Sequence, residues 1–284
     1  MLKQRIITAI VLLAILLPAL FWETPEPFMA VTLVLLTAAG WEWGRLNQLG
    51  SPASIACAVV LLVLCAAAWA GGALAQPRPL LWSVAAVAWV IGGASLIATG
   101  VPGWPRIARP VRLVGGVLAL WVAWLAVADA RMLGINFLLS VLVLVWVADI
   151  FAYFAGRAFG TKFVKRKLAP SISPGKSWEG VAGGMIGVLV LAVAWTLADR
   201  AHGGNAPSLY TVLAGLGWPV LVAAAIFLAA MSVVGDLVES LVKRAAGMKD
   251  SSGLLPGHGG VLDRVDALLP VLPLAMMMVT LAAR

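Results

Sequence analysis

The residues best able to do chemistry in this 284-residue chain lie together between Gly235 and Asp266. This segment contains acidic residues, basic residues, one histidine and several glycines within about thirty positions. Carboxylate oxygens hold hard cations such as Mg²⁺, while ammonium and guanidinium groups hold phosphate oxygens. The segment therefore predicts a site for a polyphosphate and its divalent cation.

The first part of this segment has helical spacing. Asp236, Glu239, Ser240 and Lys243 stand at positions i, i+3, i+4 and i+7, which places them on one face of a helix. The residues between them are apolar, and an apolar run precedes them. The spacing predicts a helix whose polar face runs from two acids to a cation, beginning at membrane depth.

The second part is rich in glycine. Gly259 and Gly260 follow His258, and Asp263 and Asp266 come directly after. Glycines let main-chain N–H groups approach a ligand, and the start of the next helix is a prepared anion site. We therefore expect phosphate at this helix start, with His258 contacting phosphate rather than transferring a proton.

A second polar segment spans residues 149–180. Asp149 and Tyr153 share a helical face at the end of an apolar run. Ser173, Lys176 and Ser177 then precede another apolar run, in the manner of a helix cap with phosphate-binding potential. The lysines and arginines between residues 162 and 167 favour anchoring of the loop at the membrane surface.

The composition favours a membrane protein. Hydrophobic residues make up 62% of the chain and charged residues 11%, with a mean hydropathy of +1.02. A soluble domain carries about 25% charged residues. The net charge of +8 comes from basic residues in short loops, not from a folded basic face. This distribution excludes nucleic acid as a partner and favours anionic lipid headgroups and phosphorylated substrates.

Apolar runs long enough to cross a bilayer occur about nine times. They predict an all-α, polytopic transmembrane helical bundle that forms a single integral-membrane domain over residues 1–284. The stretch 208–235 contains Gly215, Gly217 and Pro219, so a kink or a short re-entrant piece is expected there. The expected spans are 6–22, 27–44, 54–74, 79–99, 113–130, 133–155, 179–198, 213–235 and 265–283.

The distribution of basic residues predicts the orientation. With a cytoplasmic N-terminus, 16 of the 20 basic residues fall in loops on the cytoplasmic side. Both polar segments, 149–180 and 235–266, then face the cytoplasm, and the C-terminus faces outward. We expect a multi-pass protein of a bacterial-type inner membrane.

One acid lies apart from both segments. Glu42 stands within an apolar run, beside Trp41, Trp43 and Arg45. A local ion pair or a position at the membrane interface accounts for such an acid. Residues 1–130 are accordingly expected to be spans of generic role.

Three stretches resemble the phosphatidate cytidylyltransferases (CDP-diacylglycerol synthases). Residues 240–266, SLVKRAAGMKDSSGLLPGHGGVLDRVD, are similar to the family signature throughout, and residues 149–157, DIFAYFAGR, and 173–180, SPGKSWEG, are similar to two further family segments. The resemblance covers roughly residues 145–270, which we take as the catalytic part. Gly175 and Ser177 depart from the pattern, because lysine and threonine are expected there.

The resemblance implies the reaction CTP + phosphatidate → CDP-diacylglycerol + pyrophosphate, in a Mg²⁺-dependent homodimer embedded in membrane lipid. It implies that Asp236 and Asp263 are metal ligands, with a second cation possible nearby. Lys243 and His258 join these two as catalytic candidates. The candidates for substrate binding are Asp149, Tyr153, Ser173, Lys176, Ser177, Glu239, Ser240, Arg244, Lys249, Asp250, Gly259, Gly260, Arg264 and Asp266.

The main alternative is a multi-pass transporter of an anionic or phosphorylated solute. Transporters also place acids within spans, but their binding sites lie near the membrane midplane between paired broken helices. This sequence contains no such pair, and its polar residues gather at one side of the membrane.

Overall fold

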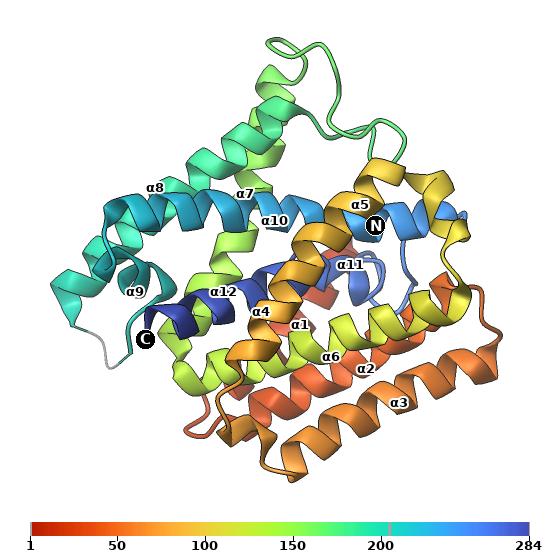
Figure 1. Ribbon diagram of the computed structural model, residues 1–284, viewed down its shortest axis with the longest axis horizontal. Helices are drawn as coiled ribbons and strands as arrows, with labels where there is room; N and C mark the ends of the chain where they lie inside the picture. The colour runs from red at the N-terminus through yellow and green to blue at the C-terminus, as the bar shows by residue number, and fades with distance from the viewer. Residues whose placement is uncertain (1, 204–205, 284) are drawn as a thin grey trace.

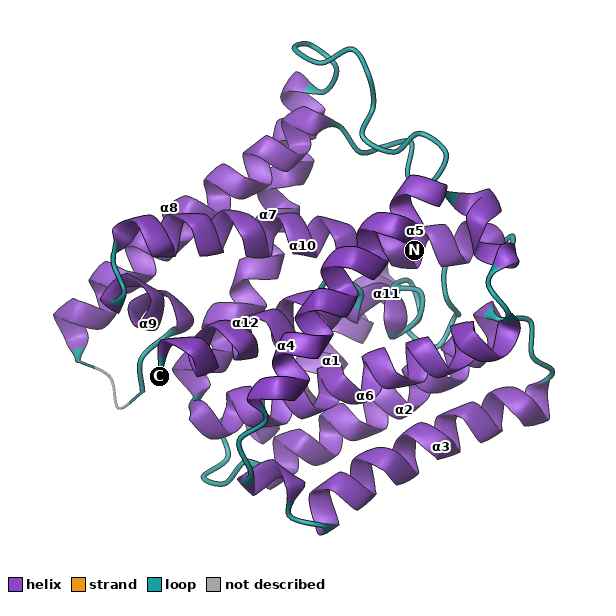
Figure 2. Ribbon diagram, in the orientation of Figure 1, coloured by secondary structure: helices purple, strands orange, loops and turns teal. Residues whose placement is uncertain are grey.

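A computed structural model of the chain describes residues 2–203 and 206–283. All regular elements in this part are helices, and two isolated β-bridges occur in loops (Figure 2). The α-helices are α1 (Leu2–Leu20), α2 (Glu26–Leu46), α3 (Ser51–Ala70), α4 (Pro79–Val87), α5 (Gly93–Thr99), α6 (Arg109–Leu133), α7 (Ile135–Phe159), α8 (Trp178–His202), α9 (Leu209–Gly215), α10 (Trp218–Ala245), α11 (Leu262–Val265) and α12 (Leu268–Ala282). The 3-10 helices are η1 (Ala73–Ala75) and η3 (Val101–Arg106), and η2 (Ala88–Gly92) is a π-helical turn.

Eight helical segments in the described part are long and apolar enough to cross a membrane. They are α1, α3, the continuous segment from α4 through η2 to α5, α6, α7, α8, α10, and the segment from α11 to α12. The 21-residue helix α2 is long enough to be a ninth span, but it carries Glu26, Glu42 and Arg45. The chain is therefore a polytopic, all-helical membrane protein, and the prediction of about nine helices is confirmed.

The region 208–245 contains a short separate piece, as expected from its glycines and proline, but the span after it starts and ends later than the predicted 213–235. A short helix, α9, ends at Gly215, and α10 starts at Trp218. Gly217 separates them with φ of +117°, a conformation that glycine adopts without strain. The 28-residue α10 then continues to Ala245, so the predicted polar face belongs to the same helix as the membrane span.

Small residues bring α7 and α8 into close contact. A Cβ atom added to Gly183 would lie 2.2 Å from the Cβ of Ala155, and one added to Gly184 would lie 2.8 Å from the carbonyl oxygen of Ala148. Spacing of small residues at four-residue intervals is typical of membrane helices whose backbones approach closely. This packing fixes the α7–α8 hairpin, and hence the 149–180 segment, as a unit.

The remaining helices place α10 beside this hairpin. Figure 1 shows α2, α3 and α6 on one side of the molecule, the α7–α8 hairpin on the other, and α10 and α12 between them. A Cβ atom added to Gly235 of α10 would lie 2.4 Å from the carbonyl oxygen of Asp266, so α10 and α11 meet closely there. The turns that follow α2 and α10 lie at the right in Figure 1, and the loop that follows α7 lies at the top.

Candidate active site

The two polar segments meet at an ion pair. The Nζ atom of Lys176, before α8, lies 2.5 Å from Oδ2 of Asp236 in α10. The Ser240 hydroxyl donates to the other oxygen of Asp236 at 3.2 Å. About a quarter of the Lys176 side chain and a third of the Asp236 side chain are exposed, so a ligand can reach both. The structure therefore joins residues that are 60 positions apart in the sequence.

Two further acids lie near Asp236. Asp149 of α7 and Asp266 after α11 each lie close enough to Asp236 for their negative charges to repel it. Lys176 and Lys243 offset part of this negative charge. Within residues 2–203 and 206–283, no group of three or more His, Cys, Asp or Glu side chains is close enough to enclose a metal ion. The acids thus form a loose anionic cluster rather than a preformed cage.

Lys243 forms a second ionic group about two turns along α10 from Asp236. Its Nζ atom lies 2.6 Å from Oε2 of Glu239 and 2.6 Å from Oδ1 of Asp263. The bonds from Ser240 to Asp236 and from Lys243 to Glu239 both join residues four positions apart. The predicted polar face of this helix is therefore confirmed, and Glu239 on it is 6% exposed.

Asp263 holds the glycine-rich loop. Its Oδ2 atom accepts hydrogen bonds from the Ser251 backbone N–H at 2.9 Å, the Ser251 hydroxyl at 2.9 Å and the Gly260 N–H at 2.7 Å. With Lys243 on the other oxygen, both carboxylate oxygens are engaged. The hydrogen bonds of Asp263 thus fix the conformation of the loop. The expected role of Asp263 as a metal ligand stays a prediction.

Glu42 is the site residue that sequence reasoning missed. Its carboxylate is fully buried and accepts hydrogen bonds from the Val261 N–H at 3.0 Å and the Leu262 N–H at 2.8 Å. It also accepts one from the Ser252 hydroxyl and one, at 3.2 Å, from the Ser251 hydroxyl, whose single proton it shares with Asp263. Helix α2, in the N-terminal half, therefore positions the loop 251–262, although the bonded residues are about 210 positions apart in the sequence.

The expectation of a local ion pair for Glu42 is wrong. The guanidinium of Arg45 instead stacks 4.8 Å from the ring centre of Trp41. Free backbone N–H groups at a helix start attract a carboxylate strongly, which explains why Glu42 turns inward. The idea that residues 1–130 serve only as generic spans needs the same correction, because α2 contributes directly to the site.

The expectation of phosphate at this helix start is wrong for the same reason. The N–H groups of Val261 and Leu262 donate to Glu42, and that of Gly260 donates to Asp263. A Cβ atom added to Gly260 would lie 2.2 Å from Oε1 of Glu42. Gly259 has φ of +80°, and a Cβ atom there would lie 2.6 Å from Oδ2 of Asp263. These two glycines make room for protein carboxylates.

The other predicted residues of the loop surround this core. Nδ1 of His258 is buried without a hydrogen-bond partner among the described atoms, and the His258 carbonyl accepts a hydrogen bond from Nε of Arg264 at 2.9 Å. Arg244 connects the two polar segments by donating to the Ile172 carbonyl at 3.4 Å. Lys249 and Asp250 are exposed.

In the 149–180 segment, Ser177 is the N-cap of α8, and its hydroxyl accepts the Gly180 N–H at 3.1 Å. The predicted cap is therefore confirmed. Ser173 is partly exposed and takes part in the turn that carries Lys176. Tyr153 is 59% exposed, and its hydroxyl accepts a hydrogen bond from Arg157 at 3.2 Å. Substrate contacts of these side chains stay predictions.

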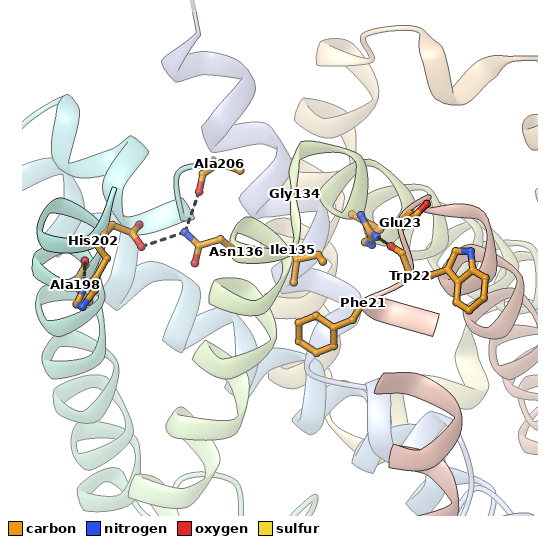
Figure 3. Close-up of a pocket in the computed structure, with 11 residues that line it drawn as sticks. Phe21, Trp22, Glu23, Gly134, Ile135, Asn136, Ala198, His202 and Ala206 are labelled. Carbon is orange, nitrogen blue, oxygen red and sulfur yellow. Dashed lines mark hydrogen bonds between the residues drawn. The ribbon is translucent and has the colours of Figure 1, made fainter. Parts of the chain in front are cut away.

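A cavity of about 810 Å³ lies at the opposite end of the α7–α8 hairpin (Figure 3). Phe21 and Trp22 line one side of it, and Asn136 and His202 line another. Asn136 is at the start of α7, and Asp149, which interacts with Lys176, lies 13 residues further along that helix, roughly 20 Å away. The residues predicted to do chemistry are absent from its lining.

Comparison with known proteins identifies the family of this chain. The model of the cytidylyltransferase family matches residues 3–282. The chain belongs to the cytidylyltransferase family. The chain is therefore a nucleotidyltransferase.

Bacterial relatives match over nearly the whole chain. The phosphatidate cytidylyltransferase of Pseudomonas aeruginosa is 41% identical over 279 residues, which cover 96% of this chain and 95% of the relative. The phosphatidate cytidylyltransferase of Haemophilus influenzae is 38% identical and covers 96% of each chain. That of Brucella abortus is 35% identical over 94% of this chain and 89% of the relative.

Proposed function

We propose that this protein transfers the cytidylyl group of CTP to phosphatidate, giving CDP-diacylglycerol and pyrophosphate. The observation that carries the proposal is the meeting of Lys176 and Asp236 from two polar segments, next to the loop that Glu42 and Asp263 hold. The relatives named above carry the same activity in their names. Charged groups of both signs at the end of a membrane bundle suit a soluble nucleotide and a lipid phosphate together.

In the proposed reaction, an oxygen of the phosphatidate phosphate forms a bond to the α-phosphorus of CTP. The bond from that phosphorus to the β-phosphate oxygen breaks, and pyrophosphate leaves with the electron pair. The attacking phosphate is already an anion, so the step needs no general base. Catalysis then consists of alignment and of stabilising charge on the leaving group.

The basic side chains supply this stabilisation. Lys176 and Lys243 are held in place by the carboxylates of Asp236, Glu239 and Asp263, so their ammonium groups are positioned before substrate binds. Arg244, Lys249 and Arg264 lie around the same loop and would hold outer phosphate oxygens. We assign His258 to phosphate contact, since its Nδ1 atom has no partner among the described residues.

The donor set fits Mg²⁺ at Asp236. Mg²⁺ in nucleotide enzymes is held by one or two carboxylates together with substrate phosphates and water, so an enclosing cage is not required. Asp236, with Asp149 and Asp266 near it, provides an excess of carboxylate charge that the two lysines only partly offset. Bound there, the ion would supply Lewis acidity toward the phosphates. Asp263 would join only by releasing Lys243, and a second cation is a further expectation from the resemblance.

Purified protein is expected to release pyrophosphate only when CTP, phosphatidate and Mg²⁺ are all present. Chelation of the divalent cation should reduce the rate to background, and added Mg²⁺ should restore it. Pyrophosphate assays with each component omitted in turn check this. Release without phosphatidate would show nucleotide hydrolysis, and absence of release with all three would leave the transporter alternative.

We also propose that the site faces the cytoplasm of a bacterial inner membrane. The native cysteines, Cys57 and Cys65, are buried, so single cysteines placed elsewhere report orientation. In spheroplasts, a membrane-impermeant maleimide is expected to label Glu23→Cys, between α1 and α2, but to label Lys165→Cys, between α7 and α8, only after permeabilisation. The reverse pattern would contradict this orientation.

A further inference from the structure

A second cavity, of about 490 Å³, lies beside the site and is almost entirely apolar. Its walls are α4 to α5 on one side and α6 on the other, with α10, α11 and α12 at its base. Val84 and Leu118 line it from the two walls and are 57% and 46% exposed. Because both walls are membrane spans, the cavity opens sideways toward hydrocarbon.

One end of this cavity carries hydrogen-bond donors without partners. Trp104 is 5% exposed, and its indole N–H has no partner among the described residues. The Nε–H of Arg112 is buried and likewise unpaired within that part of the chain. The Arg112 guanidinium lies 5.4 Å from the Trp104 ring centre, so the two donors are neighbours. Buried donors without an acceptor are costly, so an acceptor from a bound molecule would stabilise this end of the cavity.

The cavity borders the site already described through Glu239. Gly235 and Glu239 of α10 line it, and Asp236 lies between them in sequence. Glu239 also binds Lys243, which binds Asp263 of the signature loop. A molecule whose phosphate reaches Lys243 can therefore extend its apolar part into this cavity.

The α4–α5 wall of the cavity contains an irregular helical turn. The π-helical turn η2, Ala88–Gly92, interrupts the α4–α5 span on the cavity side. Such turns occur often at functional sites. A Cβ atom added to Gly92 or to Gly115, which line the cavity, would meet nothing within 4 Å. Both glycines thus leave open space that a larger side chain would fill.

We propose that this cavity holds one acyl chain of the lipid substrate, with the ester end of that chain at Trp104 and Arg112. The inference rests on the proposed function and adds to it the place where the lipid chain binds. An ester carbonyl is an acceptor for the two unpaired donors, and the volume is in the range of small-molecule sites. Gly92 and Gly115 then determine the chain length that the enzyme accepts.

The test compares phosphatidates of two chain lengths, dioctanoyl and dioleoyl, in mixed micelles. Gly115→Leu and Gly92→Leu are expected to lower the ratio of kcat/KM for the long chain over the short chain by about tenfold or more, since a pocket rejects excess methylenes to this degree. KM for CTP should not change. Val114→Trp is the matched control, because Val114 is 58% exposed and does not line the cavity.

The outcomes separate this inference from the proposed function. A wild-type protein without activity on either lipid would overturn the proposed function and, with it, the inference. An active wild type whose chain-length ratio is unchanged in both leucine variants would overturn the inference alone. A change in assembly mass by light scattering, with an unchanged ratio, would assign the cavity to an interface between two copies and also overturn it.

Discussion

Asp236→Asn is expected to lower kcat for cytidylyl transfer by about 10²–10³-fold, the cost of removing one positioned electrostatic group. Asp236 orients Lys176 from the other polar segment and lies beside Asp149 and Asp266. The asparagine keeps the shape of the side chain but loses the charge that positions the lysine and attracts a divalent cation. Steady-state kinetics at several Mg²⁺ concentrations check this expectation.

The control for this variant is Asp129→Asn. Asp129 is also a largely buried acid within a span, and it pairs with Arg78 away from the site. The control is expected to lose thermal stability while kcat stays within about twofold, because stability and transition-state binding are separate quantities. If Asp236→Asn kept near-full activity at low Mg²⁺, both the metal assignment and the role of the Lys176 pair would be wrong.

Glu42→Gln is expected to lower activity by about 10²-fold and to reduce thermal stability. The carboxylate of Glu42 accepts four hydrogen bonds, two on each oxygen. The glutamine amide offers one acceptor oxygen, so its NH₂ group would face at least one N–H or O–H donor of the loop. Each buried donor left unpaired costs about 1–3 kcal/mol, and a small displacement of the loop can cost 10²-fold in rate.

Glu26→Gln is the matched control on the same helix. Glu26 is exposed at the other end of α2 and should tolerate the change without loss of rate or stability. Thermal unfolding in detergent and initial rates of pyrophosphate release measure both quantities. Wild-type behaviour of Glu42→Gln in both assays would contradict the assignment of Glu42 as the residue that positions the loop.

The spans and the polar face of α10 could be predicted from the sequence, because both depend on local periodicity. Apolar runs mark the helices, and the i, i+4 spacing places Lys243 beside Glu239 whatever the tertiary structure. The positive-inside rule placed both polar segments at one end, but it could not predict that Lys176 contacts Asp236 rather than phosphate alone.

The partners of the loop could not be predicted, since a free backbone N–H donates to any suitably placed oxygen. The glycine-rich sequence indicated that backbone N–H groups near this loop would bind an anion, and those of residues 260–262 do. The anions are Asp263, three positions away, and Glu42, on a helix that packs there only in the folded chain. Glu42 did carry a signal, as an acid within an apolar run, and the nearby Arg45 offered a simpler explanation for it.

The apolar cavity depends equally on tertiary packing. The sequence contains Gly92 and Gly115 among many other glycines, and nothing local shows that both line one cavity. The π-helical turn in the α4–α5 span also lacks the proline that marks most helix distortions. Only the arrangement of α6, α10 and α12 makes these positions part of a binding surface.

The most direct test of cytidylyl transfer follows the phosphates of CTP separately. Purified protein receives phosphatidate, Mg²⁺ and CTP labelled either at the α-phosphate or at the γ-phosphate. If the protein transfers the cytidylyl group, the α-label enters the lipid extract as CDP-diacylglycerol, the γ-label leaves as pyrophosphate in equal amount, and Asp236→Asn slows both by about 10²–10³-fold. An α-label that stays in the aqueous phase with wild-type protein would contradict this transfer.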